Sequence, residues 1–254
     1  MGLQRVVVLV GYETVKEALV DQAEDFSGRA PVPFVYKATR GYGLVISNGE
    51  RWRQMRRFTL TTLRDFGMGR KKMESWIQEE SKHLVDLFRE NKYKMQKEID
   101  DVIGQTQSPT MEDRKSLPFT NAVIHEAQRF LDIAPLSVPH YATADISFKG
   151  YIIPKVSVIT EQIFHNYPWT FNPNHFLDKN GNFNPNPAFI PFSSGKRACV
   201  GESLARMELF LFVVTLLQHF TFSSPGGPDG VDISPEFSSF GNIPRRYELI
   251  VTPR

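Results

Sequence analysis

The side chain with the greatest capacity for chemistry in this sequence is its single thiol, that of Cys199. It lies in the run Phe192-Ser-Ser-Gly-Lys-Arg-Ala-Cys-Val-Gly201, which directly precedes an apolar segment that predicts a buried helix. A helix N-terminus and the nearby charge of Arg197 both favour a thiolate, and a thiolate is a strongly donating ligand for iron. Gly195 and Gly201 permit the turns that a flat cofactor above the sulfur would require. The alternative is that Cys199 packs as a small buried hydrophobe.

A second candidate is the pair Glu126 and Arg129, three residues apart on a helix predicted over Leu117–Leu131 and opened by Pro118. Glu126 falls on the apolar face of this helix. The residues of that face are Phe119, Ala122, Val123, Glu126 and Phe130. A buried carboxylate costs several kcal/mol unless it is paired and hydrogen-bonded, so the position predicts a partner network. A solvated surface ion pair is the alternative reading.

The densest basic cluster lies in Glu50–Arg64, which predicts an amphipathic helix with Trp52, Met55 and Phe58 among its charges. The arginines of this cluster are Arg51, Arg53, Arg56, Arg57 and Arg64. Each arginine taken alone is explained by a solvated surface. A nucleic-acid binder is a poor interpretation, because no recognised nucleic-acid fold motif accompanies the cluster.

The elements that must position these residues are mainly helices. Strands are expected at Val6–Val10 and Tyr247–Val251, and a hairpin over Asp145–Ile153 turning at Lys149-Gly150. Further helices are expected over Glu13–Val20, Ser75–Arg89, Tyr93–Ile103 (with Ile99, Val102 and Ile103 inward) and Glu202–Phe220, the last of them fully buried. Loops are expected over residues 27–49, 105–115 and 165–198, which are rich in glycine, proline or polar residues.

Composition excludes several classes of protein. The chain of 254 residues is 41% hydrophobic, which is typical of one or two globular domains, and its net charge of +2 is too small to indicate nucleic acid as a principal partner. One cysteine excludes an intrachain disulfide and a multi-cysteine zinc cage, and fits a reducing compartment. No segment reaches the roughly 20 apolar residues of a membrane span, and the N-terminus does not read as a secretory signal.

The run around Cys199 matches the cytochrome P450 signature Phe-x-x-Gly-x-Arg-x-Cys-x-Gly at every fixed position, so the chain resembles this superfamily. The resemblance implies haem b as the cofactor, with Cys199 as the proximal ligand of its iron. It also implies that Arg197 pairs with a haem propionate and that Phe192 shields the sulfur. The fold that it implies is mainly α with small β-sheets (α+β), here an incomplete cytochrome P450 fold.

Other motifs of the superfamily occur in the expected order. Trp52 and Arg56 match its Trp-x-x-x-Arg motif, and at i and i+4 both can face one propionate. Arg29 and His140 resemble two further propionate contacts. The resemblance makes Glu126, Arg129 and His175 a structural triad, and it places Ala134 and Val138 near the substrate.

One motif of the superfamily is missing. The distal helix that carries Ala/Gly-Gly-x-Asp/Glu-Thr, the proton-delivering acid–alcohol pair, has no counterpart in the sequence, and no catalytic residue is assigned. We therefore expect two portions joined near Asn91: residues 1–91, with the first sheet strands and the propionate-contacting helix, and residues 92–254, with the Glu-x-x-Arg helix and the cysteine loop. The superfamily's membrane anchor is also absent from the sequence.

The resemblance is strongest to the microsomal family-2-type members of the superfamily. It implies a haem-thiolate monooxygenase that inserts one oxygen atom of O2 into a lipophilic small molecule. Electrons would come from NADPH through cytochrome P450 reductase, with cytochrome b5 as a further partner that docks on the arginines of the Trp52 helix. The alternative is a truncated haem-binding product without turnover. The superfamily's location is the endoplasmic reticulum membrane, and a chain without the anchor would be cytoplasmic or only peripherally attached.

Overall fold

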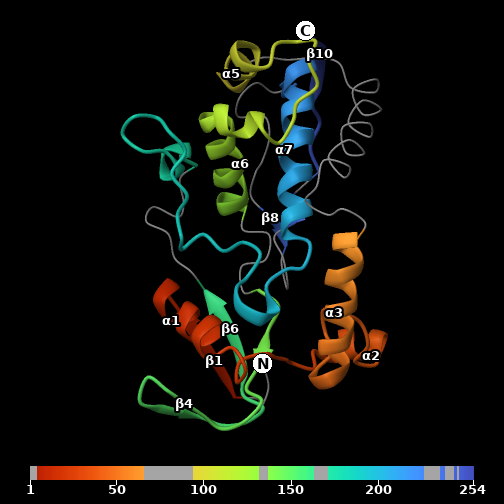
Figure 1. Ribbon diagram of the computed structural model, residues 1–254, viewed down its shortest axis with the longest axis vertical. Coiled ribbons are helices and arrows are strands. Elements are labelled where there is room, and N and C mark those ends of the chain that lie inside the picture. Colours follow the sequence, from red (N-terminus) through yellow and green to blue (C-terminus); the bar gives the residue numbers. More distant parts are fainter. Residues whose placement is uncertain are drawn as a thin grey trace. The chain divides into compact units, whose positions relative to one another are not determined.

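The computed structural model describes residues 5–65, 94–131, 137–162, 171–225, 235–237, 243–244 and 246–254 (Figure 1). The chain divides into two compact units, each built from segments distant in sequence. The first contains residues 1–63, 132–168 and 187–200, and the second contains residues 64–131, 169–186 and 201–254. The expected helix Ser75–Arg89 and the expected boundary at residue 91 lie outside the described residues.

A small mixed sheet organises the first unit. Its strands are β1 (Val6–Val10), β6 (Val158–Gln162), β3 (His140–Tyr141) and β2 (Gly28–Arg29), in that spatial order. β1 runs parallel to β6, and the other two pairings are antiparallel. The strand predicted at Val6–Val10 is confirmed. The register places Arg29 of β2 opposite His140 of β3, so two residues far apart in sequence become neighbours.

Short helices surround this sheet. They are α1 (Tyr12–Lys16), the π-helix η1 (Glu17–Asp21), α2 (Pro33–Thr39), α3 (Gly49–Asp65) and the 3₁₀ turn η4 (Gly195–Arg197). The helix predicted over Glu13–Val20 is present, but after Lys16 it continues with π-type bonds, as in Gln22 N–H to the Glu17 carbonyl at 2.9 Å. The core of this unit includes Val15, Leu19, Phe26 and Ile159.

The prediction of a continuous loop over residues 27–49 is wrong, because this stretch contains β2 and α2. Pro33 occupies the start of α2, where its fixed φ suits the first helical turn and its missing N–H costs nothing. β2 exists through its pairing with β3, a contact that local composition does not encode. The helix predicted over Glu50–Arg64 is confirmed as α3.

The predicted hairpin is also confirmed, as β4 (Ile146–Phe148) and β5 (Tyr151–Ile153). Its two turn residues, Lys149 and Gly150, have φ values of 48° and 78°. Two successive positive φ angles are the requirement of a two-residue turn whose twist matches the strands.

Three helices form the core of the second unit: α5 (Lys94–Val102), α6 (Pro118–Leu131) and α7 (Glu202–His219) (Figure 1). They match the helices expected over these segments. Ile99 and Ile103 are buried as predicted, whereas Val102 is 42% exposed because it lies off the face that packs against α7. α7 is not fully buried: Met207, Phe210, Leu211 and Val214 face the core, and most of its other residues are half-buried.

The remaining elements of the second unit are short. They are the 3₁₀ turns η2 (Asp113–Ser116) and η3 (Pro173–Phe176) and the strand pairs β7 (Phe220–Ser223) with β10 (Ile250–Pro253) and β8 (Pro235–Phe237) with β9 (Ile243–Pro244). The last strand therefore begins three residues later than Tyr247, the predicted start. The mixed α+β class with small sheets is confirmed. Within the described residues, no helix is both long enough and apolar enough to cross a membrane.

Candidate functional site

The cysteine loop (residues 192–199) is folded on itself so that its thiol reaches the surface. The Cys199 N–H donates to the Phe192 carbonyl at 2.9 Å, which closes the loop across η4. Cys199 is exposed, so the alternative of a cysteine sealed in the apolar core does not hold. Because the chain leaves this loop directly into α7, the thiol lies just before a long helix in sequence.

Gly195 fixes how this loop meets the N-terminal part of the first unit. Its φ is +67°, and a Cβ at this position would overlap the carbonyl oxygen of Leu19 in η1. A side chain is therefore excluded both by backbone conformation and by space. The signature glycine is the residue that allows η1 to lie against the loop.

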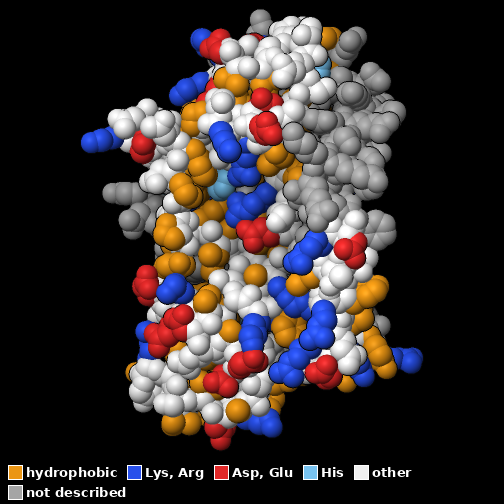
Figure 2. All heavy atoms as spheres, viewed as in Figure 1, with side chains coloured by type: hydrophobic (Ala, Val, Ile, Leu, Met, Phe, Trp, Pro, Cys, Tyr) orange, Lys and Arg blue, Asp and Glu red, His pale blue; other side chains and the backbone are white. Residues whose placement is uncertain are grey.

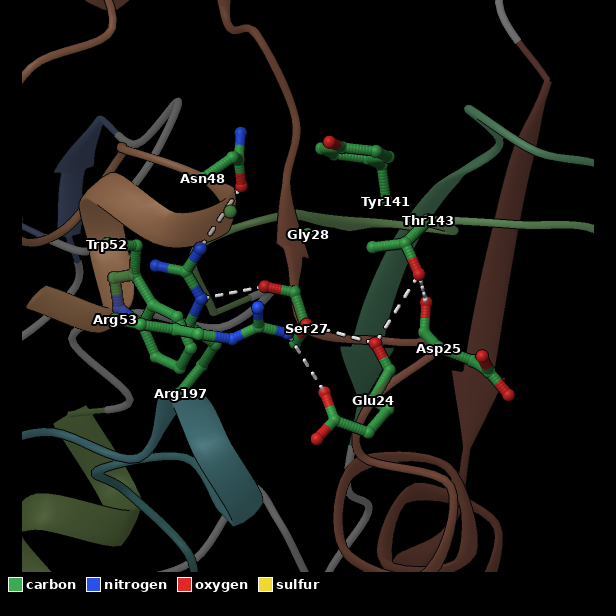
Figure 3. Close-up of a pocket in the computed structure, with 11 residues that line it drawn as sticks. Glu24, Asp25, Ser27, Gly28, Asn48, Trp52, Arg53, Tyr141, Thr143 and Arg197 are labelled. Atoms are coloured by element: carbon green, nitrogen blue, oxygen red, sulfur yellow. Dashed lines mark hydrogen bonds and ion pairs between the residues drawn. The ribbon is translucent and has the colours of Figure 1, made fainter.

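Arg197 is almost completely buried, with 6% of its surface exposed, and it bonds to three neighbours. Its Nε donates to the Ser27 carbonyl at 2.7 Å and its Nη2 donates to Asn48 Oδ1 at 3.1 Å (Figure 3). Nη2 also donates to the Ser47 carbonyl at 2.7 Å. Its guanidinium also stacks 3.9 Å from the ring centre of Trp52. Nη1 is buried, and no residue that the structure describes accepts a hydrogen bond from it.

Positive charge is concentrated around Arg197. Burial, followed by the charges of Arg29 and Arg56, lowers its pKa well below the ordinary value, to about 9. No carboxylate pairs with Arg56 or Arg197 in the described parts of the chain. A group of cations that is held together without a paired acid favours a bound anion.

Arg29 and His140, neighbours on β2 and β3, lie beside this charge. Arg29 donates from Nη1 to the Val138 carbonyl and from Nη2 to the Arg197 carbonyl at 3.5 Å. His140 Nδ1 lies 2.7 Å from the Phe26 carbonyl, which can only accept, so this nitrogen carries hydrogen. Burial, assisted by the charge of Arg29, lowers the His140 pKa to about 3. The other ring nitrogen, Nε2, is buried and has no partner among the residues described.

Trp52 and Arg56 bring α3 to the same place. Trp52 is buried, and Arg56 Nη1 donates to the Ala198 carbonyl at 3.0 Å, next to Cys199 in sequence. Burial lowers the Arg56 pKa, and the negative charge of a Cys199 thiolate opposes this shift. The guanidinium of Arg56 therefore lies near the Cys199 thiol.

The first unit thus gathers all seven residues predicted to bind the cofactor. They are Arg29, Trp52, Arg56, His140, Phe192, Arg197 and Cys199. Of these seven, Trp52 and Arg197 line a cavity of about 410 Å³, together with Tyr141 and the carboxylates Glu24 and Asp25 (Figure 3). An exposed thiol in the same unit as buried arginines, with Arg197 Nη1 lacking an acceptor within the described residues, fits a metal-containing dianion such as haem b.

The second unit contains the predicted triad. Glu126 is completely buried, and Arg129 donates to both of its oxygens, from Nε to Oε2 and from Nη2 to Oε1, each at 2.7 Å. The Asn172 N–H donates to Oε1 at 2.6 Å, and His175 Nδ1 lies 3.2 Å from both oxygens. Burial alone would raise the Glu126 pKa, but these hydrogen bonds and the charge of Arg129 hold it below its ordinary value. The structure therefore brings Glu126, Arg129 and His175 together.

Two residues that were not predicted from the sequence, His125 and Asn48, also make side-chain hydrogen bonds in these units. His125, beside Glu126 on α6, is buried, with Nδ1 2.8 Å from the Asn121 carbonyl and Nε2 3.2 Å from Arg206 Nη1. Asn48 contacts both Arg29 and Arg197. Such contacts depend on the folded geometry and cannot be read from the sequence. The only local signal at Asn48 is the pair Asn48-Gly49 at the start of α3.

His125 makes the stability of the second unit dependent on pH. Burial lowers its pKa from 6.5 to about 4, with the charges of Arg114 and Arg206 acting in the same direction. Between those two values the unfolded chain binds a proton that the folded chain does not. The free energy of unfolding should therefore fall as pH decreases through this window, by up to about 1.4 kcal/mol per pH unit.

Urea unfolding of the cofactor-free protein at pH 7, 6 and 5 measures this slope. His125→Gln keeps a donor and an acceptor but cannot titrate, so it should show a shallower decrease than the parent. Equal slopes in the parent and the variant would mean that His125 is not the group responsible.

The two remaining predicted residues are Ala134 and Val138, which were expected near the substrate. Ala134 lies outside the described residues, and Val138 is 41% exposed.

Lys and Arg side chains gather over α3 on the face shown in Figure 2. Arg51, Arg53 and Arg57 of α3 are exposed. Arg53 Nη2 lies 3.8 Å from Glu24 Oε2, and Glu24 also pairs with Lys196 of the cysteine loop.

Comparison with known proteins gives a consistent result. A family model described as "Cytochrome P450" matches residues 1–93 and 90–251 of the chain. "Cytochrome P450 2F3" of Capra hircus is 31% identical over 422 aligned positions, which cover 100% of this chain and 86% of the relative. "Cytochrome P450 2G1" of Rattus norvegicus is 32% identical over 421 positions, covering 100% and 85%. "Cytochrome P450 2B4" of Oryctolagus cuniculus is 30% identical over 417 positions, covering 98% and 85%.

Proposed function

The chain belongs to the cytochrome P450 family, whose general function is haem-dependent monooxygenation, and from this premise we propose that it binds haem b with Cys199 as the thiolate ligand of the iron. The observation that carries the proposal is the exposed thiol set among Arg29, Arg56 and Arg197 in one compact unit. Bound haem supplies the capacity to activate O2 for insertion of one oxygen atom into a substrate.

The residues of the first unit have distinct roles in this proposal. Arg197 Nη1 is a buried donor that a propionate oxygen would satisfy, whereas the neutral ring of His140 presents Nε2 as an acceptor. Because Nδ1 of His140 already carries hydrogen, its ring donates to an anion from Nε2 only when it is protonated. Arg56 keeps positive charge near the sulfur, Trp52 supports Arg197 through its ring, and Phe192 covers the thiolate. The triad of Glu126, Arg129 and His175 acts structurally, in the second unit.

In the complete reaction of this proposal, a lipophilic small molecule is oxidised with electrons that come from NADPH through cytochrome P450 reductase. Cytochrome b5 is a second electron donor. The exposed arginines of α3 support docking of an acidic electron-transfer partner on that face (Figure 2). Val138, exposed next to the Arg29 contact, and Ala134 are proposed to face the substrate. Location at the endoplasmic reticulum membrane, with peripheral attachment, belongs to the same proposal.

The second candidate function is a haem-binding product without turnover. It is favoured by the length of the alignments: the relatives are matched over more than 400 positions, although this chain has 254 residues, and the family model matches in two separate segments. We infer an incomplete family fold whose two portions, residues 1–91 and 92–254, join where the relatives carry further residues. The acid–alcohol pair is missing from the sequence, so this chain has no assigned group to control protons on the distal side.

One experiment separates the two candidates. The chain is loaded with haem, reduced and treated with carbon monoxide, and its absorption is compared before and after addition of reductase, NADPH and a lipophilic substrate. A thiolate-type Soret shift with product supports the monooxygenase. A thiolate-type shift without product supports the haem-binding product, and no shift in well-folded, haem-exposed protein rejects both.

A further inference from the structure

Asn48 connects two parts of the first unit that are remote in sequence. Its Oδ1 accepts a hydrogen bond from Arg197 Nη2 at 3.1 Å (Figure 3). The same oxygen accepts another from the Arg29 N–H at 2.7 Å. Its Nδ2 donates to the Arg29 carbonyl at 3.0 Å. A single side-chain amide therefore joins β2 to the cysteine loop.

The contact with Arg29 resembles that of a neighbouring strand. In the sheet order β1-β6-β3-β2, β2 lies at the edge, so its outer side has no strand to pair with among those described. The Asn48 amide supplies both an acceptor for the Arg29 N–H and a donor for its carbonyl. Only an amide offers both groups in one plane; aspartate at neutral pH only accepts, and leucine, of similar shape, does neither.

The Asn48 amide also restricts the position of the Arg197 guanidinium. Asn48 Oδ1 and the Ser47 carbonyl both accept from Nη2, which leaves Nη1 as the nitrogen without a partner in the described chain. Arg29 meanwhile reaches the carbonyl of Arg197 itself. Asn48 thus sets the position of one arginine through its backbone and of the other through its guanidinium.

We propose that Asn48 is a positioning residue that holds Arg29 and Arg197 at the separation needed to bind one dianionic group. The part of this inference that identifies the anion as haem rests on the proposed function. The part that concerns the two arginines rests on the contacts alone.

Two substitutions at Asn48 have different consequences for stability. Asn48→Asp places a negative charge beside Arg197, which favours the folded chain, but it also replaces the amide donor with a carboxylate oxygen that faces the Arg29 carbonyl. Because these two effects oppose each other, the melting temperature of the haem-free chain should stay close to that of the parent. The same carboxylate competes with a propionate for Arg197, so haem should be lost faster. Asn48→Leu removes all three hydrogen bonds and should lower both stability and haem retention.

The first measurement is transfer of haem from the loaded chain to apomyoglobin. We expect transfer from Asn48→Asp to be roughly tenfold faster than from the parent, without a lower melting temperature of the haem-free chain. Asn180→Asp is the control, since it adds the same charge at an exposed turn of the second unit. Equal transfer rates for Asn48→Asp and Asn180→Asp would overturn the inference.

The second measurement needs no haem. Asn48→Leu, Arg197→Lys and the double variant are melted without cofactor. If Asn48 positions Arg197, the double variant should lose less than the sum of the single losses, with a shortfall of roughly 2–4 °C. Additive losses would refute the positioning role, even if the parent chain bound no haem and the proposed function had failed.

Discussion

Replacing Cys199 with serine is expected to abolish the thiolate signature of the reduced, carbon monoxide-treated chain completely. A hydroxyl at this position is not ionised at neutral pH and is a poor ligand for haem iron, so the donating bond to the metal is lost. Because Cys199 is exposed, the substitution should change the free energy of unfolding of the haem-free chain by no more than about 0.5 kcal/mol. A large spectral effect with a small stability effect identifies a ligand and not a packing residue.

Cys199→His is the companion variant for this experiment. Imidazole binds haem iron through nitrogen, so this variant should retain haem with a spectrum that lacks the thiolate signature. Because the chain has no other cysteine, a thiolate-type spectrum that persisted in Cys199→Ser would come from a thiol outside the chain and would contradict Cys199 as the source of the signature.

Glu126→Ala should lower the free energy of unfolding by about 3–5 kcal/mol, the effect typical of breaking a buried ion pair. Removal of the carboxylate leaves the guanidinium of Arg129, whose side chain is 3% exposed, without its bidentate partner. It also leaves the Asn172 N–H without its acceptor. We expect a shift of the urea midpoint to lower concentration and a low yield of soluble, haem-loaded protein.

Asp101→Ala is the matched control for Glu126→Ala. Asp101 pairs with Lys97 at 2.6 Å on α5 in the same unit, but its side chain is 62% exposed. An exposed pair of this kind contributes little to stability, so this variant should unfold close to the parent. Similar urea midpoints for Glu126→Ala, Asp101→Ala and the parent would contradict the buried network.

Local patterns in the sequence predicted the elements whose stability is local. The apolar run Val6–Val10, the amphipathic α3 and the Lys149-Gly150 turn each contain their own signal in periodicity or turn chemistry. β2 was missed because its two residues form a strand only by pairing with His140 and Tyr141, more than a hundred residues away. The π-helix η1 has no distinct composition to mark it.

The residues of the candidate site also divide into those that the sequence predicts and those that only the folded chain reveals. Arg197 and Glu126 could be singled out from motif spacing, because charged side chains at fixed intervals are visible in a sequence. Their partners could not, because these are the carbonyls of Ser27 and Ser47 and the N–H of Asn172. Every residue carries such backbone groups, so only the folded chain shows which of them are used.

The close approach of Gly195 to Leu19 has a consequence for the order of folding. The cysteine loop reaches its final shape only after it meets η1, a segment near the opposite end of the sequence. Contacts between such distant residues form slowly, because a very long loop must close first. During synthesis the N-terminal segment therefore makes this contact only after the cysteine loop has emerged.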